Sequence, residues 1–540
     1  MKKESKKKKE CFLMGGIVHL LVLWIFCTGF LLRIGAGEEV VPKQGGVCFR
    51  YDDIHKVREW EEMADLFERN GFRMCLAVMP DSFATPQHGE CLAQLAKRGH
   101  EIMDHTPEHS MFQLRYPTKQ EFEEAAKLPF VAETRPGSNW VFFRYEFRKE
   151  HPENARFTGS VSGNELTAAD PEFLNRLTYT RKIYIPSTGK IYGIRIQDGR
   201  RRLFTFWGTG GVNLSLKNEP MILCSDLAIR PSGALIRYMA ERSRRGFRKY
   251  GIPDPKVWCQ PGGWEPFLSV EEIRDVYEKE FHYRSASCVP EVYPYFNCFN
   301  DPDPDRYRFA MRPMFRFFDE EASLDEIKKR IVDSAARHRV LIFLSHMNTR
   351  RIPGGWKTYM ESHGQLLAWL REKRIPVRTQ TQWAEILYSK KADPTVDMMP
   401  PLTVDLNDDG IPDGWDFNSG AEADLAKGEA ILPRTGILEV NGLAGLEKGR
   451  CRFSLRCRGA KGARILVDFE QFPHREWRKP SAKQTAVFEM SGDAGQLFTQ
   501  EVEIKPETVV MNLRIRTTAD AAVSSPVFRK IQENNNRSQK

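Results

Sequence analysis

The chain has 540 residues, a length that predicts about two to four domains. Hydrophobic residues make up 41% and charged residues 28% of it, which excludes disorder as its main state. Lys and Arg outnumber Asp and Glu by 81 to 72, but the first 37 residues hold seven basic and two acidic residues. The remainder has 74 basic against 70 acidic residues, and so small an excess disfavours a nucleic-acid partner.

A basic run at the N-terminus precedes an uncharged, apolar stretch over residues 11–32. This order is typical of an export segment and predicts that everything after it lies outside the cytoplasm. Small residues at 35–37 suit a signal peptidase, whereas the 22-residue length of the run also suits a membrane anchor. Residues 1–37 are therefore expected to be either a cleaved signal peptide or a signal anchor in the membrane, and the working part to be extracytoplasmic.

Short apolar segments alternate with amphipathic ones over two parts of the chain. In the first part, strands are predicted over 46–51, 72–79 and 100–104, with helices over 55–70 and 88–98. In the second, helices are predicted over 234–250, 270–280, 324–339, 357–374 and 382–388, with strands over 257–259, 283–289, 340–344 and 375–378. This order favours parallel strands joined by crossover helices. We expect an α/β domain with a deformed (β/α) barrel, built from residues 38–111 and 230–389.

Two regions have a β-type pattern instead. Residues 112–229 carry short strand-like runs separated by turn signals, which predicts a β-rich insertion that shapes the substrate cleft. After a linker at 390–402, residues 403–532 alternate in the manner of a β-sandwich, and the tail 533–540 is expected to be disordered. Within this second region, Cys451 and Cys457 are either a disulfide pair or two small core residues.

Three polar segments each follow a predicted strand. They are residues 50–53 (Arg-Tyr-Asp-Asp), residues 105–109 (His-Thr-Pro-Glu-His) and residues 344–346 (Leu-Ser-His). Because parallel barrels build their sites at the carboxyl ends of strands, these segments are expected to converge. Each motif alone is more often turn chemistry or a solvated helix face, and it is their joint occurrence that indicates a site.

The second segment predicts two imidazoles that face one point. Thr106 suits a helix N-cap and Pro107 the first helical position, so His105 would precede a helix and His109 would lie in its first turn. With a carboxylate from Asp53, these histidines make a three-ligand site with open positions, as a hydrolytic divalent metal requires, zinc being the default. The adjacent Asp52 remains free to act as a base.

On these residues the chain resembles the polysaccharide deacetylase family, also called the NodB-homology or carbohydrate esterase family 4 group. The family has a T-F-D-D-like motif, an H-[ST]-x-x-H motif and a late L-x-H motif, and the three segments above are similar to them. The resemblance covers residues 46–111 and 230–388. It implies that Asp53, His105 and His109 bind the metal, that Asp52 is the base and that His346 is the acid that protonates the leaving group.

Two family features are missing from the sequence. The third motif, similar to R-x-P-[YF]-G, has no arginine at the matching place in residues 258–264, although its Pro-Gly turn leaves Gly262 and Trp264 as expected oxyanion and substrate contacts. An acidic fourth motif is absent from residues 285–291. The expected activity is release of N- or O-acetyl groups from a carbohydrate polymer. The alternatives are a C–N hydrolase acting on a non-sugar amide, or a glycan-binding surface protein with impaired turnover.

Residues 405–416 have oxygen-bearing side chains at the spacing of a calcium loop. The candidate ligands are Asp405, Asn407, Asp409, Asp413 and Asp416. The segment also resembles those that begin many bacterial surface β-domains, so the alternative is a capped turn with Trp415 in the core. A carbohydrate-binding role for the C-terminal domain is an expectation by analogy.

Overall fold

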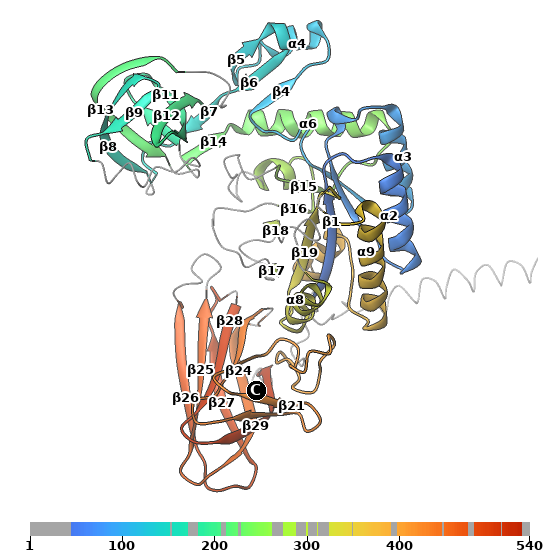
Figure 1. Cartoon of the computed structure of the whole chain (residues 1–540), viewed down its shortest axis with the longest axis vertical. Helices are drawn as coiled ribbons and strands as arrows, with labels where there is room; N and C mark the ends of the chain where they lie inside the picture. Colours follow the sequence, from blue (N-terminus) through green and yellow to red (C-terminus); the bar gives the residue numbers. More distant parts are fainter. Residues whose placement is uncertain are drawn as a thin grey trace, which may run out of the picture.

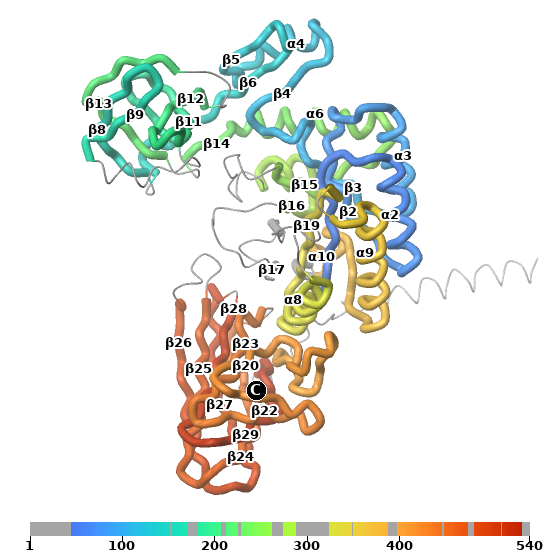
Figure 2. The backbone as a smooth tube through the Cα atoms, in the orientation of Figure 1, coloured from blue at the N-terminus to red at the C-terminus, as the bar shows by residue number. Residues whose placement is uncertain are grey.

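The computed structural model is shown in Figures 1 and 2. It describes residues 45–531 except 152–153, 171–181, 207–211, 225–227, 262–273, 288–298, 301–309, 312–322, 348, 351, 390–396, 445, 447, 473–479 and 509. The predicted export segment lies outside these residues. None of the described helices combines the length and the apolar character needed to cross a membrane.

An eight-stranded sheet forms the centre of the molecule, and its strands come from both α/β parts of the sequence. In spatial order they are β17 (Phe299–Asn300), β19 (Val340–Ser345), β1 (Gly46–Asp52), β2 (Cys75–Val78), β3 (Glu101–Asp104), β15 (Val257–Cys259), β16 (Ser285–Ser287) and β18 (Ala310–Met311). All neighbours are parallel except β17 and β19. Among the described residues β17 and β18 are the edge strands, so the eight strands form a largely parallel half-barrel, part of the barrel that the sequence predicted.

Helices flank this sheet near the positions that the sequence predicts. They are α2 (Val57–Arg69), α3 (Pro86–Lys97), α6 (Gly233–Lys249), η4 (Arg274–Glu278), α8 (Leu324–Ala336), α9 (Gly355–Glu372) and α10 (Gln380–Ser389). The buried residues of α2 recur at helical spacing and pack with Phe49 and Phe343 of the sheet in one core. The strand predicted over 375–378 is wrong: only Val377 makes a bridge, to Val47.

The insertion contains two small β units between β3 and α6. A three-stranded sheet and short helices come first: β4 (Gln113–Arg115), α4 (Lys119–Ala125), β5 (Val131–Arg135), η2 (Pro136–Ser138) and β6 (Trp140–Phe143). A closed six-stranded barrel follows: β8 (Ala155–Gly163), β9 (Glu165–Ala168), β10 (Lys182–Ile185), β11 (Lys190–Gln197), β12 (Arg200–Thr205) and β13 (Leu214–Cys224). The strand β7 (Tyr145–Phe147) joins the three-stranded sheet to the barrel, and its partner β14 (Ile229–Pro231) leads from the barrel to α6.

The C-terminal region consists of two five-stranded antiparallel sheets that share one hydrophobic core. One sheet has the order β20 (Asp416–Asn418), β23 (Ile437–Leu443), β28 (Val510–Thr517), β25 (Arg464–Phe472) and β26 (Ala482–Glu489). The other has the order β21 (Glu422–Asp424), β22 (Glu429–Leu432), β29 (Ala521–Lys530), β24 (Gly449–Gly459) and β27 (Gln496–Ile504). Cys451 and Cys457 are both buried core residues of the single strand β24, and they do not form the disulfide considered above.

The insertion and the C-terminal region attach at opposite ends of the central sheet (Figure 1). Arg337, just after α8 and before β19 begins, pairs with Asp416 of β20 at 2.9 Å. The guanidinium of Arg339 covers the backbone of Gly442, where it leaves no room for a Cβ atom. The C-terminal region therefore meets the amino ends of the strands. The insertion leaves from the carboxyl end of β3, on the side where parallel sheets place their sites.

Candidate metal centre

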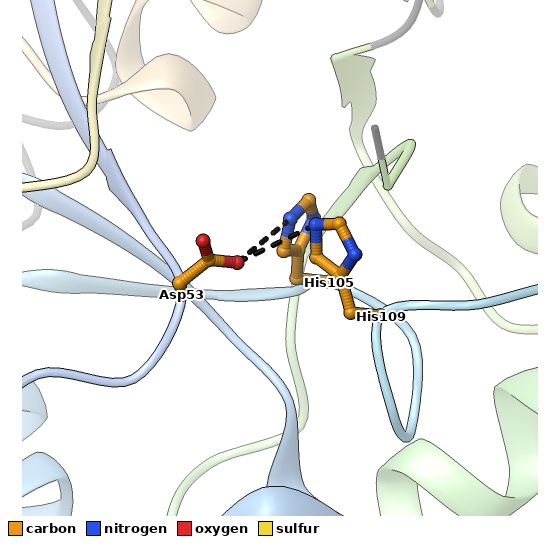
Figure 3. A group of neighbouring side chains, drawn as sticks. All are labelled: Asp53, His105 and His109. Atoms are coloured by element: carbon orange, nitrogen blue, oxygen red, sulfur yellow. Dashed lines mark ion pairs between the residues drawn. The ribbon is translucent and has the colours of Figure 1, made fainter. Parts of the chain in front are cut away.

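Three predicted ligands converge at the carboxyl ends of β1 and β3 (Figure 3). Asp53 Oδ1 lies 3.4 Å from His109 Nε2 and 3.7 Å from His105 Nε2. One ligand atom from each of the three residues lies within 4.8 Å of the others. Among the residues that the structure describes, this is the one group of His, Cys, Asp and Glu side chains spaced to hold an ion.

His105 is held in the state that a metal ligand needs. Its side chain is buried, and burial lowers its pKa to about 4, so the ring is neutral near pH 7. Nδ1 lies 3.2 Å from the carbonyl oxygen of Cys259 and donates its proton there. The lone pair of Nε2 therefore points towards Asp53, as in metal sites where a backbone carbonyl fixes the histidine tautomer.

The donor set fits a divalent cation. Asp53 Oδ1 and His105 Nε2 are buried atoms without a hydrogen-bond partner. Leaving such atoms unpaired is costly, and two imidazoles with one carboxylate would satisfy both atoms by binding one ion. The side chains of Asp53 and His109 are 37% and 40% exposed, so this cluster opens to solvent on one side, where water or a substrate has access.

The turn that carries the two histidines differs from its prediction. Residues 106–108 form a turn and no helix follows, because Thr106 and His109 have positive φ angles of 65° and 54°. The backbone N–H of Thr106 donates to Asp104 at 2.9 Å, and the Thr106 hydroxyl accepts from the N–H of Ser110 at 3.1 Å. Asp53 also has a positive φ, 74°. Such strained angles in non-glycine residues cluster at functional sites.

Asp52 is held by Arg50, a residue to which the sequence motifs assigned no role. Arg50 Nε lies 2.7 Å from Asp52 Oδ1 and Arg50 Nη2 lies 2.8 Å from Oδ2, so the pair is bidentate and fully buried. Burial would raise the pKa of Asp52, but the charge of Arg50 and its hydrogen bonds to the carboxylate outweigh burial and hold that pKa below its usual value. The carboxylate is therefore ionised and fixed in orientation.

The arginine that pairs with Asp52 comes from β1 and not from residues 259–261, where the family pattern would have it. Cys259, a small and fully buried residue, stands where the R-x-P pattern would have arginine, and its side chain lies near the guanidinium of Arg50. Arg50 Nη1 also contacts the hydroxyl of Ser287 on β16. A signal was present in the sequence, because residues 50 and 52 of one strand point to the same face.

Two more histidines approach the cluster. His346, directly after β19, places Nε2 3.9 Å from Asp53 Oδ2, with its side chain 32% exposed. His55 Nε2 lies 2.8 Å from the carbonyl oxygen of Asp52, to which it donates. The expected oxyanion and substrate contacts, Gly262 and Trp264, lie outside the described residues.

The predicted calcium ligands make hydrogen bonds and ion pairs with other residues. Backbone N–H groups of the same loop donate to the carboxylates of Asp405 and Asp413. Asp409, which Asn407 contacts, pairs with Lys329 of α8 at 3.1 Å, and Asp416 pairs with Arg337. Burial raises the pKa of Asp413 to about 7. Calcium binding stays a prediction, and the interactions present connect this loop to α8.

Comparisons with known proteins give structural matches only, since no family model and no curated protein matches the sequence. A family 4 carbohydrate esterase from Streptomyces lividans is 10% identical with a TM-score of 0.26, over 63% of this chain and 94% of that chain. The catalytic domain of a peptidoglycan N-acetylglucosamine deacetylase from Eubacterium rectale is 9% identical with a TM-score of 0.27, over 67% and 98%. A xylan-binding domain of Paenibacillus barcinonensis Xyn10C is 12% identical with a TM-score of 0.20, over 26% and 97%.

The Streptomyces lividans esterase carries the name of the family that the sequence motifs resemble. At these identities and TM-scores the matches carry no functional argument. The functional interpretation therefore depends on the residues of the site.

Proposed function

We propose that the protein is a metal-dependent deacetylase that hydrolyses acetyl groups on a carbohydrate polymer outside the cytoplasm. The observation that carries the proposal is the geometry of the site at the carboxyl ends of β1, β3 and β19. Three metal-type ligands, an ionised carboxylate and a further imidazole meet there, in the order of motifs that the family resemblance implies. The apolar segment at residues 11–32 supports the extracytoplasmic location.

Asp53, His105 and His109 would hold the metal, for which zinc is the default choice. A divalent ion in this position supplies Lewis-acid polarisation of an acyl carbonyl and activation of a water molecule. The protein contributes a neutral His105, oriented by the Cys259 carbonyl, and an opening beside His109 through which the acetyl group enters.

Asp52 would act as the general base. One of its carboxylate oxygens takes a proton from the attacking water, while Arg50 keeps the carboxylate from rotating. His346 would act as the general acid and deliver a proton from its ring to the departing nitrogen or oxygen. A backbone N–H near Gly262 remains the proposed oxyanion donor, and Trp264 a proposed substrate contact. With Arg50 present, the missing third-motif arginine no longer favours the non-catalytic alternative.

The C-terminal region would serve a role separate from catalysis. Its two sheets attach at the end of the central sheet opposite the site, so they do not line the reaction centre. We interpret them as a β-sandwich that binds carbohydrate or attaches the enzyme to a surface. A calcium ion bound at residues 405–416 is part of this proposal.

Acetate release tests the function. The purified chain from residue 38, supplied with zinc, is expected to release acetate from acetylated polysaccharides and to be much slower with acetylated amines that carry no sugar. A preference for the non-sugar amides would instead favour the C–N hydrolase alternative. Affinity for glycans with no acetate released from any substrate would favour a binding protein.

A further inference from the structure

An aromatic cluster begins immediately after the metal-binding turn. Phe112 lies three residues beyond His109, a stretch that spans at most about 11 Å. Its ring centre is 4.9 Å from that of Tyr145 and 5.3 Å from that of Phe206, and the last two rings are 5.2 Å apart. The three rings therefore connect the turn that carries His109 to the inserted β-barrel.

A cavity of about 720 Å³ continues from this cluster. Tyr145 and Phe206 line it together with Tyr184, whose ring packs against that of Phe147 with 4.5 Å between ring centres. Figure 1 shows that β7 lies between the three-stranded sheet and the barrel. Tyr145 and Phe147 of this strand line the cavity. The volume is in the range of ligand-binding sites, and aromatic walls are suited to stacking on the apolar faces of sugar rings.

The charged residues of the cavity are mostly cationic. Arg144, Lys149 and Lys190 are exposed side chains on its wall, and Lys149 Nζ lies over the Tyr184 ring at 5.5 Å. Glu133, the acidic residue in the described lining, lies 3.4 Å from Arg135, which offsets its charge. Positive charge beside aromatic rings complements a ligand that has both sugar rings and carboxylates.

We propose that this cavity, the insertion groove, is a substrate subsite that binds an anionic glycan chain whose acetylated unit reaches the metal centre. The inference rests on the proposed function and specifies its substrate class as acidic polysaccharide. Phe112 contacts two residues of the groove wall and lies three residues from His109. A chain that leaves the groove on the Phe112 side would therefore present its acetyl group to the site. Arg144, Lys149 and Lys190 would pair with carboxylates, while the half-buried Phe206 would contact a ring face.

Binding is measured separately from turnover by using the full chain with Asp52→Asn. An acetylated polyuronate is expected to bind more tightly than an acetylated neutral xylan of equal length, and its affinity should fall with increasing salt. In the same background, Arg144→Ala/Lys149→Ala should weaken binding of the polyuronate about tenfold. The matched control Lys119→Ala/Lys217→Ala removes two exposed lysines of the insertion outside the groove and should leave the affinity within about twofold.

Turnover adds a second readout. In the active chain, kcat/KM is compared between the acetylated polyuronate and a small acetyl ester. The ratio of the two values should fall about tenfold in Arg144→Ala/Lys149→Ala and about tenfold in Phe206→Ala. Phe206→Tyr should restore the ratio. Equal binding of neutral and anionic chains, or groove variants indistinguishable from the lysine control, would overturn the inference. If the unmutated chain releases no acetate from any substrate, the proposed function fails, and the binding measurement still decides whether the groove takes an anionic glycan.

Discussion

Asp52→Asn is expected to reduce kcat for acetate release about 10²- to 10⁴-fold while the protein keeps its metal. The asparagine side chain has nearly the same shape, but its amide oxygen is too weak a base to take a proton from water. The three metal-type ligands are unchanged, because Asp52 is bound by Arg50 and is not one of them. Steady-state kinetics and the zinc content of the same preparation provide the two measurements.

The adjacent carboxylate supplies the matched control. Asp53→Asn removes the charged metal ligand and should lower both metal content and turnover, whereas Asp52→Asn should lower turnover alone. If Asp52→Asn retains more than about a tenth of the normal rate, Asp52 is not the base. If it loses the metal together with activity, the division of roles between the two residues is wrong.

The second large effect is expected at Arg50. Arg50→Gln removes the charge that keeps the pKa of Asp52 low, so that pKa should rise, burial now acting unopposed by Arg50. The acidic limb of the kcat/KM profile should therefore move to higher pH, because Asp52 must lose its proton before it can serve as a base. Breaking a buried ion pair also costs about 3–5 kcal/mol of stability, which denaturant unfolding would measure.

The stability change has a definite pH dependence. Because the folded-state pKa of Asp52 is depressed, its pairing with Arg50 stabilises the protein above the unfolded pKa, and this stabilisation is lost as pH falls through the folded pKa. The difference in unfolding free energy between the normal protein and Arg50→Gln should thus be larger near pH 7 than in acid.

Arg50→Lys distinguishes orientation from charge. It keeps the positive charge but loses the bidentate geometry, so it should fold better than Arg50→Gln and still turn over slowly. Arg230→Lys, at a buried arginine of β14 away from the site, is the control for a general effect of altering a buried arginine. An unchanged pH profile in both Arg50 variants would contradict the assigned role.

Much of the central sheet could be predicted because its sequence signals are local. Strand-length apolar runs and the helical spacing in α2 depend on neighbouring residues, so β1, β2, β3 and their helices lie near the predicted positions. The convergence of Asp53, His105 and His109 followed from the rule that parallel strands bring their carboxyl ends together. Local periodicity combined with one topological rule was sufficient to predict that these three side chains meet.

The features that were missed depend on contacts between distant segments. Thr106, Pro107 and Glu108 have the composition of a helix start, yet Asp104 accepts the Thr106 N–H and the chain turns instead. The role of Arg50 depends on the space left by Cys259 and on Ser287, more than 200 residues away. Closure of the inserted barrel likewise depends on pairing of β10 with β13, which no local pattern specifies.

The metal content of the soluble chain from residue 38 tests the central claim most directly. The chain should be purified without chelator, supplied with zinc, and compared with His105→Ala/His109→Ala. The account predicts close to one divalent ion per normal chain and its loss in the double variant, with both proteins folded by circular dichroism. A normal chain that is folded but takes up no zinc or other divalent ion, or a double variant that binds it equally well, would contradict the proposed hydrolytic site.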